Sequence, residues 1–273
     1  MSLRSHPKLS RMSHSTNCCR AEYLDLLKRS LVNWLYHDAE HEVLYTHEDI
    51  SLVKRAPFDP ARRKIGRDYS IHAHTLVGFE RLDNIRYCVE TAVSDNVPGD
   101  LIETGVWRGG SCIFMRGVLK ALGVTDRVVW VADSFEGLPK PDAENYPADD
   151  GNRLHTYDEL AVSLEAVKDT FDRYGLLDDQ VKFLKGWFRD TLPGAPIEKL
   201  AVLRLDGDMY ESTMDALTNL YDRVSPGGFV IVDDYGAYDY CRKAIHDFRE
   251  ERGISDEIHS IDWTGVYWRK GRT

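Results

Sequence analysis

Four aspartates are the residues of this chain with the clearest capacity for chemistry. They form two pairs, each directly after an apolar run: Asp206 and Asp208 after 200–205, and Asp233 and Asp234 after 228–232. Carboxylates next to low-dielectric surroundings need protons or cations to balance their charge. Because carboxylate oxygens suit hard cations, the pattern predicts a metal site, with Mg²⁺ as the first candidate.

The elements that position these acids form a strand, a helix and a second strand. The segment 211–224 has helical length, and Pro226-Gly227-Gly228 is typical of a turn. A crossover of this kind makes the two strands parallel, so their carboxyl ends face the same way. Ligands of open α/β sheets bind outside those ends. We therefore expect the four acids to converge on one ligand crevice.

A glycine-rich turn earlier in the chain predicts a second ligand. Strand 100–105 leads through Gly109-Gly110 into helix 112–122, where a helix N-terminus favours negative charge. The spacing differs from G-x-G-x-x-G and lacks the Lys-Ser/Thr ending of a phosphate loop. Asp133 ends the next strand, thirty positions after Glu103, where an acid can accept hydrogen bonds from a ribose diol. Either feature alone is typical of an ordinary turn or cap, but together they indicate an adenosine-type cofactor.

Strands and helices alternate along the rest of the chain, which predicts an α/β fold with a largely parallel sheet. Further helices are expected at 79–95, 157–174 and 238–252, and further strands at 127–132 and 181–184. Alternating patterns around a tight turn predict an antiparallel hairpin at the sheet edge, formed by 257–261 and 265–268.

The N-terminal third of the chain does not show this alternation of strands and helices. Residues 1–20 are basic and Ser-rich without an apolar signal region, so we expect a disordered leader. Leucines at helical spacing predict an amphipathic helix over 21–36. This helix needs a partner surface, either on the domain itself or on a second subunit, and it favours a homo-oligomer. Residues 37–70 are polar and broken by prolines, as in a loop or lid. The expected domains are thus the leader, a helical extension and lid over 21–98, and the main domain over 99–273.

The composition excludes several classes of protein. A formal net charge of −10 argues against a nucleic-acid surface. The five cysteines show no spacing typical of zinc or of a disulfide framework, which favours the reducing cytoplasm. No stretch approaches the roughly 18 apolar residues of a membrane span.

Four motifs together resemble those of the macrocin O-methyltransferase family. They are Glu103 to Gly110 (ETGVWRGG), Ala132 to Gly137 (ADSFEG), Asp206 to Tyr210 (DGDMY) and Asp233 to Tyr235 (DDY). The resemblance runs from about residue 23 to 269. It implies a Rossmann-like class I methyltransferase fold, with a mostly parallel seven-stranded sheet whose last strand is antiparallel. It also implies S-adenosylmethionine and Mg²⁺ as cofactors, and a sugar hydroxyl of a glycosylated natural product as the methyl acceptor.

The resemblance assigns roles to particular residues. Asp206, Asp233 and Asp234 match the metal-binding acids, and Asp208 matches the position of the general base. Residues matched to the cofactor site are Glu103, Gly105, Asp133, Ser134, Thr75, Gly78 and Trp187, with Asp133 on the ribose and Trp187 near the adenine. The segment 136–155 would be a mobile cover over the substrate. His72 and His74 are more typical of loop or packing histidines than of catalytic ones.

The chemistry of methyl transfer agrees with these roles. The reaction is an in-line displacement that depends on positioning, and a sugar hydroxyl must lose its proton. In extended backbone, Asp206 and Asp208 would lie on one face, so one can bind metal while the other takes the proton.

Three rival functions remain open from the sequence. Asp206-Gly207-Asp208 also fits the D-x-D metal site of a glycosyltransferase, although that reading leaves Gly105 and Asp133 unexplained. A dehydrogenase is disfavoured by the glycine spacing, and a binding module gives the acids no purpose. Within the methyltransferases, a glycolipid or phenolic acceptor is the alternative to a natural-product glycoside.

Overall fold

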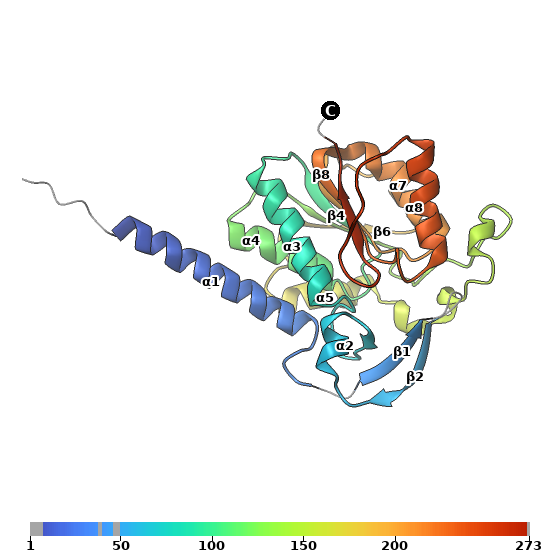
Figure 1. Ribbon diagram of the computed structural model, residues 1–273, viewed down its shortest axis with the longest axis horizontal. Coiled ribbons are helices and arrows are strands. Elements are labelled where there is room, and N and C mark those ends of the chain that lie inside the picture. Colours follow the sequence, from blue (N-terminus) through green and yellow to red (C-terminus); the bar gives the residue numbers. More distant parts are fainter. Residues whose placement is uncertain (1–7, 38–39, 46–49, 272–273) are drawn as a thin grey trace, which may run out of the picture.

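The computed structural model describes residues 8–37, 40–45 and 50–271, with side chains from 18–37 and 57–271. Its centre is a seven-stranded sheet of order β6-β5-β4-β7-β8-β10-β9 (Figure 1). β4 to β8 pair in parallel, whereas β10 runs antiparallel to β8 and β9 antiparallel to β10. The expected α/β class with an antiparallel end is confirmed. The strands are β4 Asp100–Thr104, β5 Val129–Asp133, β6 Val181–Lys185, β7 Leu200–Leu205, β8 Val224–Val232, β9 His259–Ser260 and β10 Val266–Arg269.

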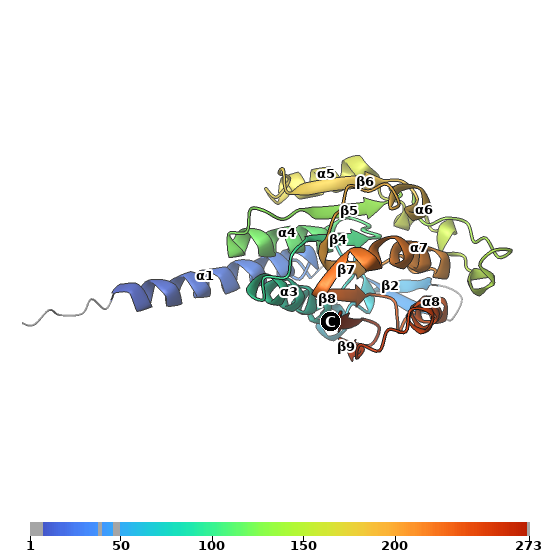
Figure 2. The ribbon, with the colours of Figure 1, turned by 90° about the horizontal axis from the view of Figure 1, so that it is seen from above.

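Helices cover both faces of this sheet, which explains why its central strands β4 and β7 are buried along almost their whole length. Every residue of β7 is buried, as expected for a strand covered on both sides. One hydrophobic core joins the sheet to α1, α3, α4 and α5, and a second joins it to α7 and α8 (Figure 2). The helices are α1 Lys8–Leu31, α3 Phe79–Ser94, α4 Gly110–Leu122, α5 Leu164–Arg173, α6 Phe188–Thr191, α7 Tyr210–Leu220 and α8 Asp239–Glu251.

The N-terminal part differs from the sequence-based expectation. The chain is helical from Lys8, so α1 includes residues 8–20 of the expected leader. Its last turns pack on the domain through Leu24, Leu27 and Leu31, and its first turns extend away from it (Figures 1 and 2). Residues 37–70, expected as loop, contain a three-stranded sheet of order β2-β1-β3 and a short helix. These elements are β1 Glu40–Tyr45, β2 Ile50–Ala56, α2 Pro60–Lys64 and β3 Asp68–Tyr69.

Local boundaries also differ in the main domain. Pro226 to Gly228, expected as a turn, lie within β8, which meets β7 through a register shift between Leu200 and Val202. The helix expected over 157–174 begins only at Leu164, where the Ser163 side chain accepts the N–H of Ala166 and caps it. The predicted C-terminal hairpin is confirmed as β9 and β10. Within the described part of the chain, no helix is both long and apolar enough to cross a membrane.

Candidate active site

A single cavity lies outside the carboxyl ends of the parallel strands and contains most of the predicted site residues. Those that line it are Thr75, Glu103, Gly105, Asp133, Ser134, Trp187, Asp206, Asp208, Asp233 and Asp234. We call Gly105, Val106, Asp133 and Ser134 the glycine edge. We call Asp206, Asp208, Asp233 and Asp234 the acid edge. The sheet order places the two edges side by side, because β4 lies next to β7.

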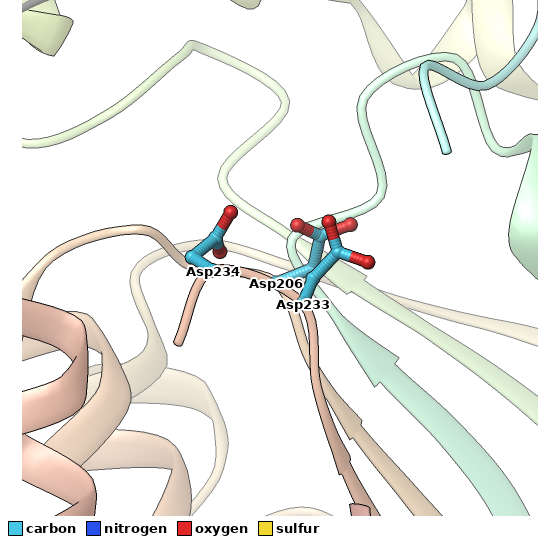
Figure 3. Close-up of side chains that lie close together, drawn as sticks. All are labelled: Asp206, Asp233 and Asp234. Atoms are coloured by element: carbon cyan, nitrogen blue, oxygen red, sulfur yellow. The ribbon is translucent and has the colours of Figure 1, made fainter. Parts of the chain in front are cut away.

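Three carboxylates of the acid edge converge. Asp206, Asp233 and Asp234 each offer an oxygen, and these oxygens lie within 4.8 Å of one another. Figure 3 shows the three side chains turned to the same side of the strand ends, with Asp206 and Asp233 adjacent. Burial raises the pKa of Asp206 to about 6, and the neighbouring charge of Asp233 adds to the rise. The convergence expected from the two parallel strands is therefore present.

A buried arginine holds this cluster together. Arg204 lies inside β7 with its side chain 0% exposed, and it forms ion pairs with Glu103, Asp206 and Asp233. The contact from Nη1 of Arg204 to Oδ2 of Asp206 is 2.5 Å. A buried guanidinium is tolerated when its charge is paired in this way. Arg204 thus joins the acid of β4 to those of β7 and β8.

A second arginine approaches from helix α3. Arg81 donates to Oδ2 of Asp233 and, at 2.9 Å, to Oδ2 of Asp262. Both oxygens of Asp233 therefore accept from a guanidinium, Oδ1 from Arg204 and Oδ2 from Arg81. Neither arginine was singled out in the sequence. The available signal was a charged residue within the apolar run Leu203-Arg204-Leu205.

The donor set of the acid edge fits a hard divalent cation. The carboxylates outnumber the two arginines, so negative charge remains in excess at the strand ends. Among the described residues, Oδ1 of Asp206 and Oδ1 of Asp234 accept no hydrogen bond from a protein donor. Mg²⁺ takes one or two carboxylates directly and keeps several waters, so it does not require a complete protein cage.

Asp208 lies beside the other acids, but it is positioned by a hydrogen bond and not by the extended backbone that the sequence predicted. Its φ of 56° places it in the left-handed region, so the extended spacing assumed for Asp206 and Asp208 is wrong. Its backbone N–H instead donates to Oδ2 of Asp234 at 3.2 Å, which fixes the residue beside the other acids. Burial, followed by the charges of Asp206 and Asp233, raises the pKa of Asp208 well above its usual range.

The glycine edge is built from backbone contacts. Gly105 has a φ of 87°, and a Cβ there would lie 1.8 Å from the carbonyl oxygen of Asp206, so only glycine fits. Oδ2 of Asp133 accepts the N–H of Val106 at 2.7 Å, and Oδ1 accepts the N–H of Phe135 at 2.7 Å. Asp133 therefore fixes the turn, and its pKa is raised by burial despite these hydrogen bonds.

The remaining predicted residues vary in how well they fit the cavity. Glu103 lines it, yet its carboxylate is engaged by Arg204 and by the Cys112 thiol at 2.8 Å. Burial raises the pKa of Glu103 to about 7. Gly78 does not line the cavity: it precedes α3, where a Cβ would meet the backbone of Lys64 and Ile65.

The two histidines lie outside the cavity lining. His74 Nδ1 lies 2.8 Å from the hydroxyl of Tyr174, and burial lowers its pKa to about 4. Its carbonyl oxygen accepts the N–H of Gly110 at the start of α4. His74 is therefore a packing residue behind the glycine edge. His72 is exposed.

The segment expected as a mobile cover is anchored to the domain through Asp149. Asp149 is fully buried, and its carboxylate accepts the N–H groups of Tyr210 and Glu211 at 2.8 and 2.9 Å. This is an N-terminal cap of α7 supplied from a distant loop. The loop is consequently tied to the helix that follows the acid edge.

Comparison with known proteins identifies the chain. The family model described as macrocin-O-methyltransferase (TylF) matches residues 20–270. The chain belongs to this family. It is therefore an O-methyltransferase, as its motifs implied, and the fold of this family implies S-adenosylmethionine.

Individual relatives agree with this assignment. A tetracenomycin-C 4'-O-methyltransferase of Streptomyces olivaceus, named for a dimethoxy-rhamnosyl substrate, is 58% identical over 93% of this chain and 94% of its own length. A mycinamicin III 3''-O-methyltransferase of Micromonospora griseorubida is 55% identical over 91% and 96%. The solved structure of the O-methyltransferase NovP matches with a TM-score of 0.86 at 50% identity, covering 93% of this chain and all of that one. These relatives are O-methyltransferases, so the glycosyltransferase, dehydrogenase and binding-module readings are set aside.

Proposed function

We propose that this enzyme transfers a methyl group from S-adenosylmethionine to a sugar hydroxyl of a glycosylated natural product, with Mg²⁺ held by Asp206, Asp233 and Asp234. The observation that carries the proposal is the adjacency of the two edges in one cavity, where Gly105 packs directly on the backbone of Asp206. A cofactor at the glycine edge and a cation at the acid edge would thus be neighbours. The relatives named for rhamnosyl and mycinamicin substrates support a glycoside acceptor.

Different residues of the site bind the ligands, orient the carboxylates and accept the proton. Asp133 and the turn at Gly105 hold the adenosine part, while Arg204 and Arg81 orient the carboxylates of the acid edge. Bound Mg²⁺ supplies positive charge that favours the loss of a proton from a nearby hydroxyl. Asp208 accepts that proton on its carboxylate. Burial and the charges of Asp206 and Asp233 raise the pKa of Asp208, which makes this carboxylate a stronger base.

Calorimetry and an acceptor assay test the proposal. The protein is titrated with S-adenosylhomocysteine in the presence of Mg²⁺ and again after EDTA. Binding that survives EDTA, together with Mg²⁺ binding that is lost in Asp234→Ala, supports two adjacent sites. Methylation is then measured with demethyl glycosides, glycolipids and phenols in parallel. Turnover confined to lipids or phenols contradicts the glycoside acceptor, and a protein that binds no S-adenosylhomocysteine contradicts the cofactor.

We also propose a homodimer or higher homo-oligomer in the cytoplasm. The helix α1 and the turn after it expose Tyr23, Leu26, Leu35 and Tyr36, which a second subunit would cover. Light scattering coupled to gel filtration measures the mass, and a monomer at working concentration contradicts this assembly.

A further inference from the structure

The cavity contains a buried carboxylate that none of the roles above uses. Glu211 lies in the first turn of α7 and lines the cavity, and its side chain is 3% exposed. Arg189 Nη1 donates to its Oε1 at 2.8 Å. Its other oxygen, Oε2, is buried and has no hydrogen-bond partner among the described residues. An unpaired buried carboxylate oxygen is costly, so a site that retains one is poised for a donor from a ligand.

The surroundings of Glu211 indicate what kind of group would bind. Its backbone N–H is held by Asp149, so its position on α7 is fixed. Asp215, one turn further along α7, also lines the cavity, and two acids then face the single charge of Arg189. A carboxylate only accepts hydrogen bonds. The subsite therefore suits a hydrogen-bond donor such as an amine.

The position of the subsite indicates which amine. Arg189 belongs to α6, which follows β6, and β6 lies next to β5 with Asp133 at its end. The cavity that contains Asp133 continues past the end of β6, where Gly186, Trp187 and Phe188 line it, so the base of an adenosine whose ribose lies at Asp133 has room there. The start of α6 also lies against the start of α7, because a Cβ on Gly207 would be 3.2 Å from Phe188 and 3.1 Å from Ser212. A base at the end of β6 is thus beside the first turn of α7.

We propose that Oε2 of Glu211 accepts a hydrogen bond from the exocyclic amine of the adenine ring, and so selects adenine over its deaminated form. This assignment rests on the proposed use of S-adenosylmethionine. Hypoxanthine carries a carbonyl oxygen in place of the amine. That oxygen would face Glu211 as acceptor against acceptor, and a site that loses such a hydrogen bond rejects the analogue.

The test measures binding rather than turnover. The full chain is titrated calorimetrically with S-adenosylhomocysteine and with S-inosylhomocysteine, and the ratio of the two affinities is the readout. We expect the unmodified protein to prefer the adenosyl ligand by about tenfold or more. In Glu211→Gln the ratio falls towards one, because the amide can donate to the carbonyl oxygen as well as accept from the amine. The matched control is Asp190→Asn, an exposed acid beside Arg189 that does not line the cavity, which keeps the preference.

Three results overturn the assignment. Equal affinities in the unmodified protein do so without any variant, whether or not Glu211→Gln folds. A preference that survives in folded Glu211→Gln shows that Glu211 does not accept from the amine. A preference that disappears in Asp190→Asn shows that the charge around Arg189, and not Oε2 of Glu211, sets it. Absence of binding by either ligand to the folded, unmodified protein instead removes the proposed cofactor, and this inference with it.

Discussion

The two edges of the cavity satisfy their carboxylates by opposite means. At the glycine edge, Asp133 accepts from the neutral N–H groups of Val106 and Phe135, each at 2.7 Å. At the acid edge, Asp233 accepts from the guanidinium groups of Arg204 and Arg81. Backbone amides fix the position of a carboxylate without cancelling its charge. Guanidinium groups fix its position and also cancel its charge.

The difference shows what each edge is built to do. Asp133 is locked in place, so the glycine edge is a shape that a ligand can enter without rearrangement. The acid edge has more carboxylates than arginines, so part of its charge is balanced only when a cation or protons arrive. The raised pKa values of Asp206, Asp208 and Asp234 express the same excess, since burial and like charge both favour their protonated forms.

The largest expected effect separates catalysis from binding. We expect Asp208→Asn to lower turnover by about 10²–10⁴-fold, because the amide cannot accept the hydroxyl proton. The affinity for S-adenosylhomocysteine should change less than about threefold, because Asp208 belongs to the acid edge. Single-turnover assays and calorimetry measure the two quantities. Near-normal turnover would remove Asp208 as the base and leave the acid edge only a binding role.

A pair of variants within the acid edge distinguishes charge balance from metal binding. Asp233→Ala leaves Arg204 and Arg81 without one of their acids, so we expect a loss of about 3–5 kcal/mol in the free energy of unfolding. Asp234→Ala removes an acceptor only for the N–H of Asp208, so its loss should be about 1 kcal/mol. Both variants should lose Mg²⁺ binding. Urea unfolding without metal measures stability, and equal losses would contradict the role assigned to the arginines.

A variant at the glycine edge should have a smaller effect, and it should weaken cofactor binding rather than Mg²⁺ binding. Asp133→Asn turns an NH₂ group towards one of two backbone N–H donors, which costs about 2 kcal/mol of stability. The turn then loosens, so the affinity for S-adenosylhomocysteine should fall by about tenfold. Mg²⁺ affinity should be retained, and calorimetry with each ligand checks both. A loss of Mg²⁺ binding would show that the two edges are not independent.

The sequence predicted the positions of the acids because they follow a simple rule. Asp206 and Asp233 end neighbouring parallel strands, and the carboxyl ends of such strands meet at one edge whatever the loops do. The rule failed at Asp208, where the backbone leaves the extended conformation and the two-residue spacing no longer decides which way a side chain points.

The partners of the acids depend on tertiary structure and were missed. Arg204 meets Glu103 because β4 lies beside β7, and the two residues are 101 positions apart. Arg81 meets Asp233 across 152 positions, through the packing of α3 on the sheet. The strands β1 and β2 were missed for a related reason: they form by pairing with each other, and neither shows a regular alternation of polar and apolar residues.

Two partly buried groups, one next to each edge, should change the stability of the fold with pH in opposite directions. Each change should be about 1 kcal/mol after allowance for solvent screening. Behind the glycine edge, burial lowers the pKa of His74 from 6.5 to about 4. Its contribution to stability is complete above pH 6.5 and is lost as the pH falls towards 4. Beyond the acid edge, burial raises the pKa of Asp215 from 3.8 to about 6, and Glu211 adds to the rise. Its contribution is complete below pH 3.8 and is lost as the pH rises through 6.

Variants without these titrating groups make the contrast measurable. Relative to the unmodified protein, His74→Asn should gain stability as the pH falls from 6.5 to 4, and Asp215→Asn should gain it as the pH rises from 4 to 6. Urea midpoints over this range give both slopes. The double variant should show the sum of the two, because the residues share no contact and distant sites add. Slopes of the same sign would mean that burial does not set the pKa shift of one of the two residues. The contrast between the edges would then apply to their hydrogen bonding alone.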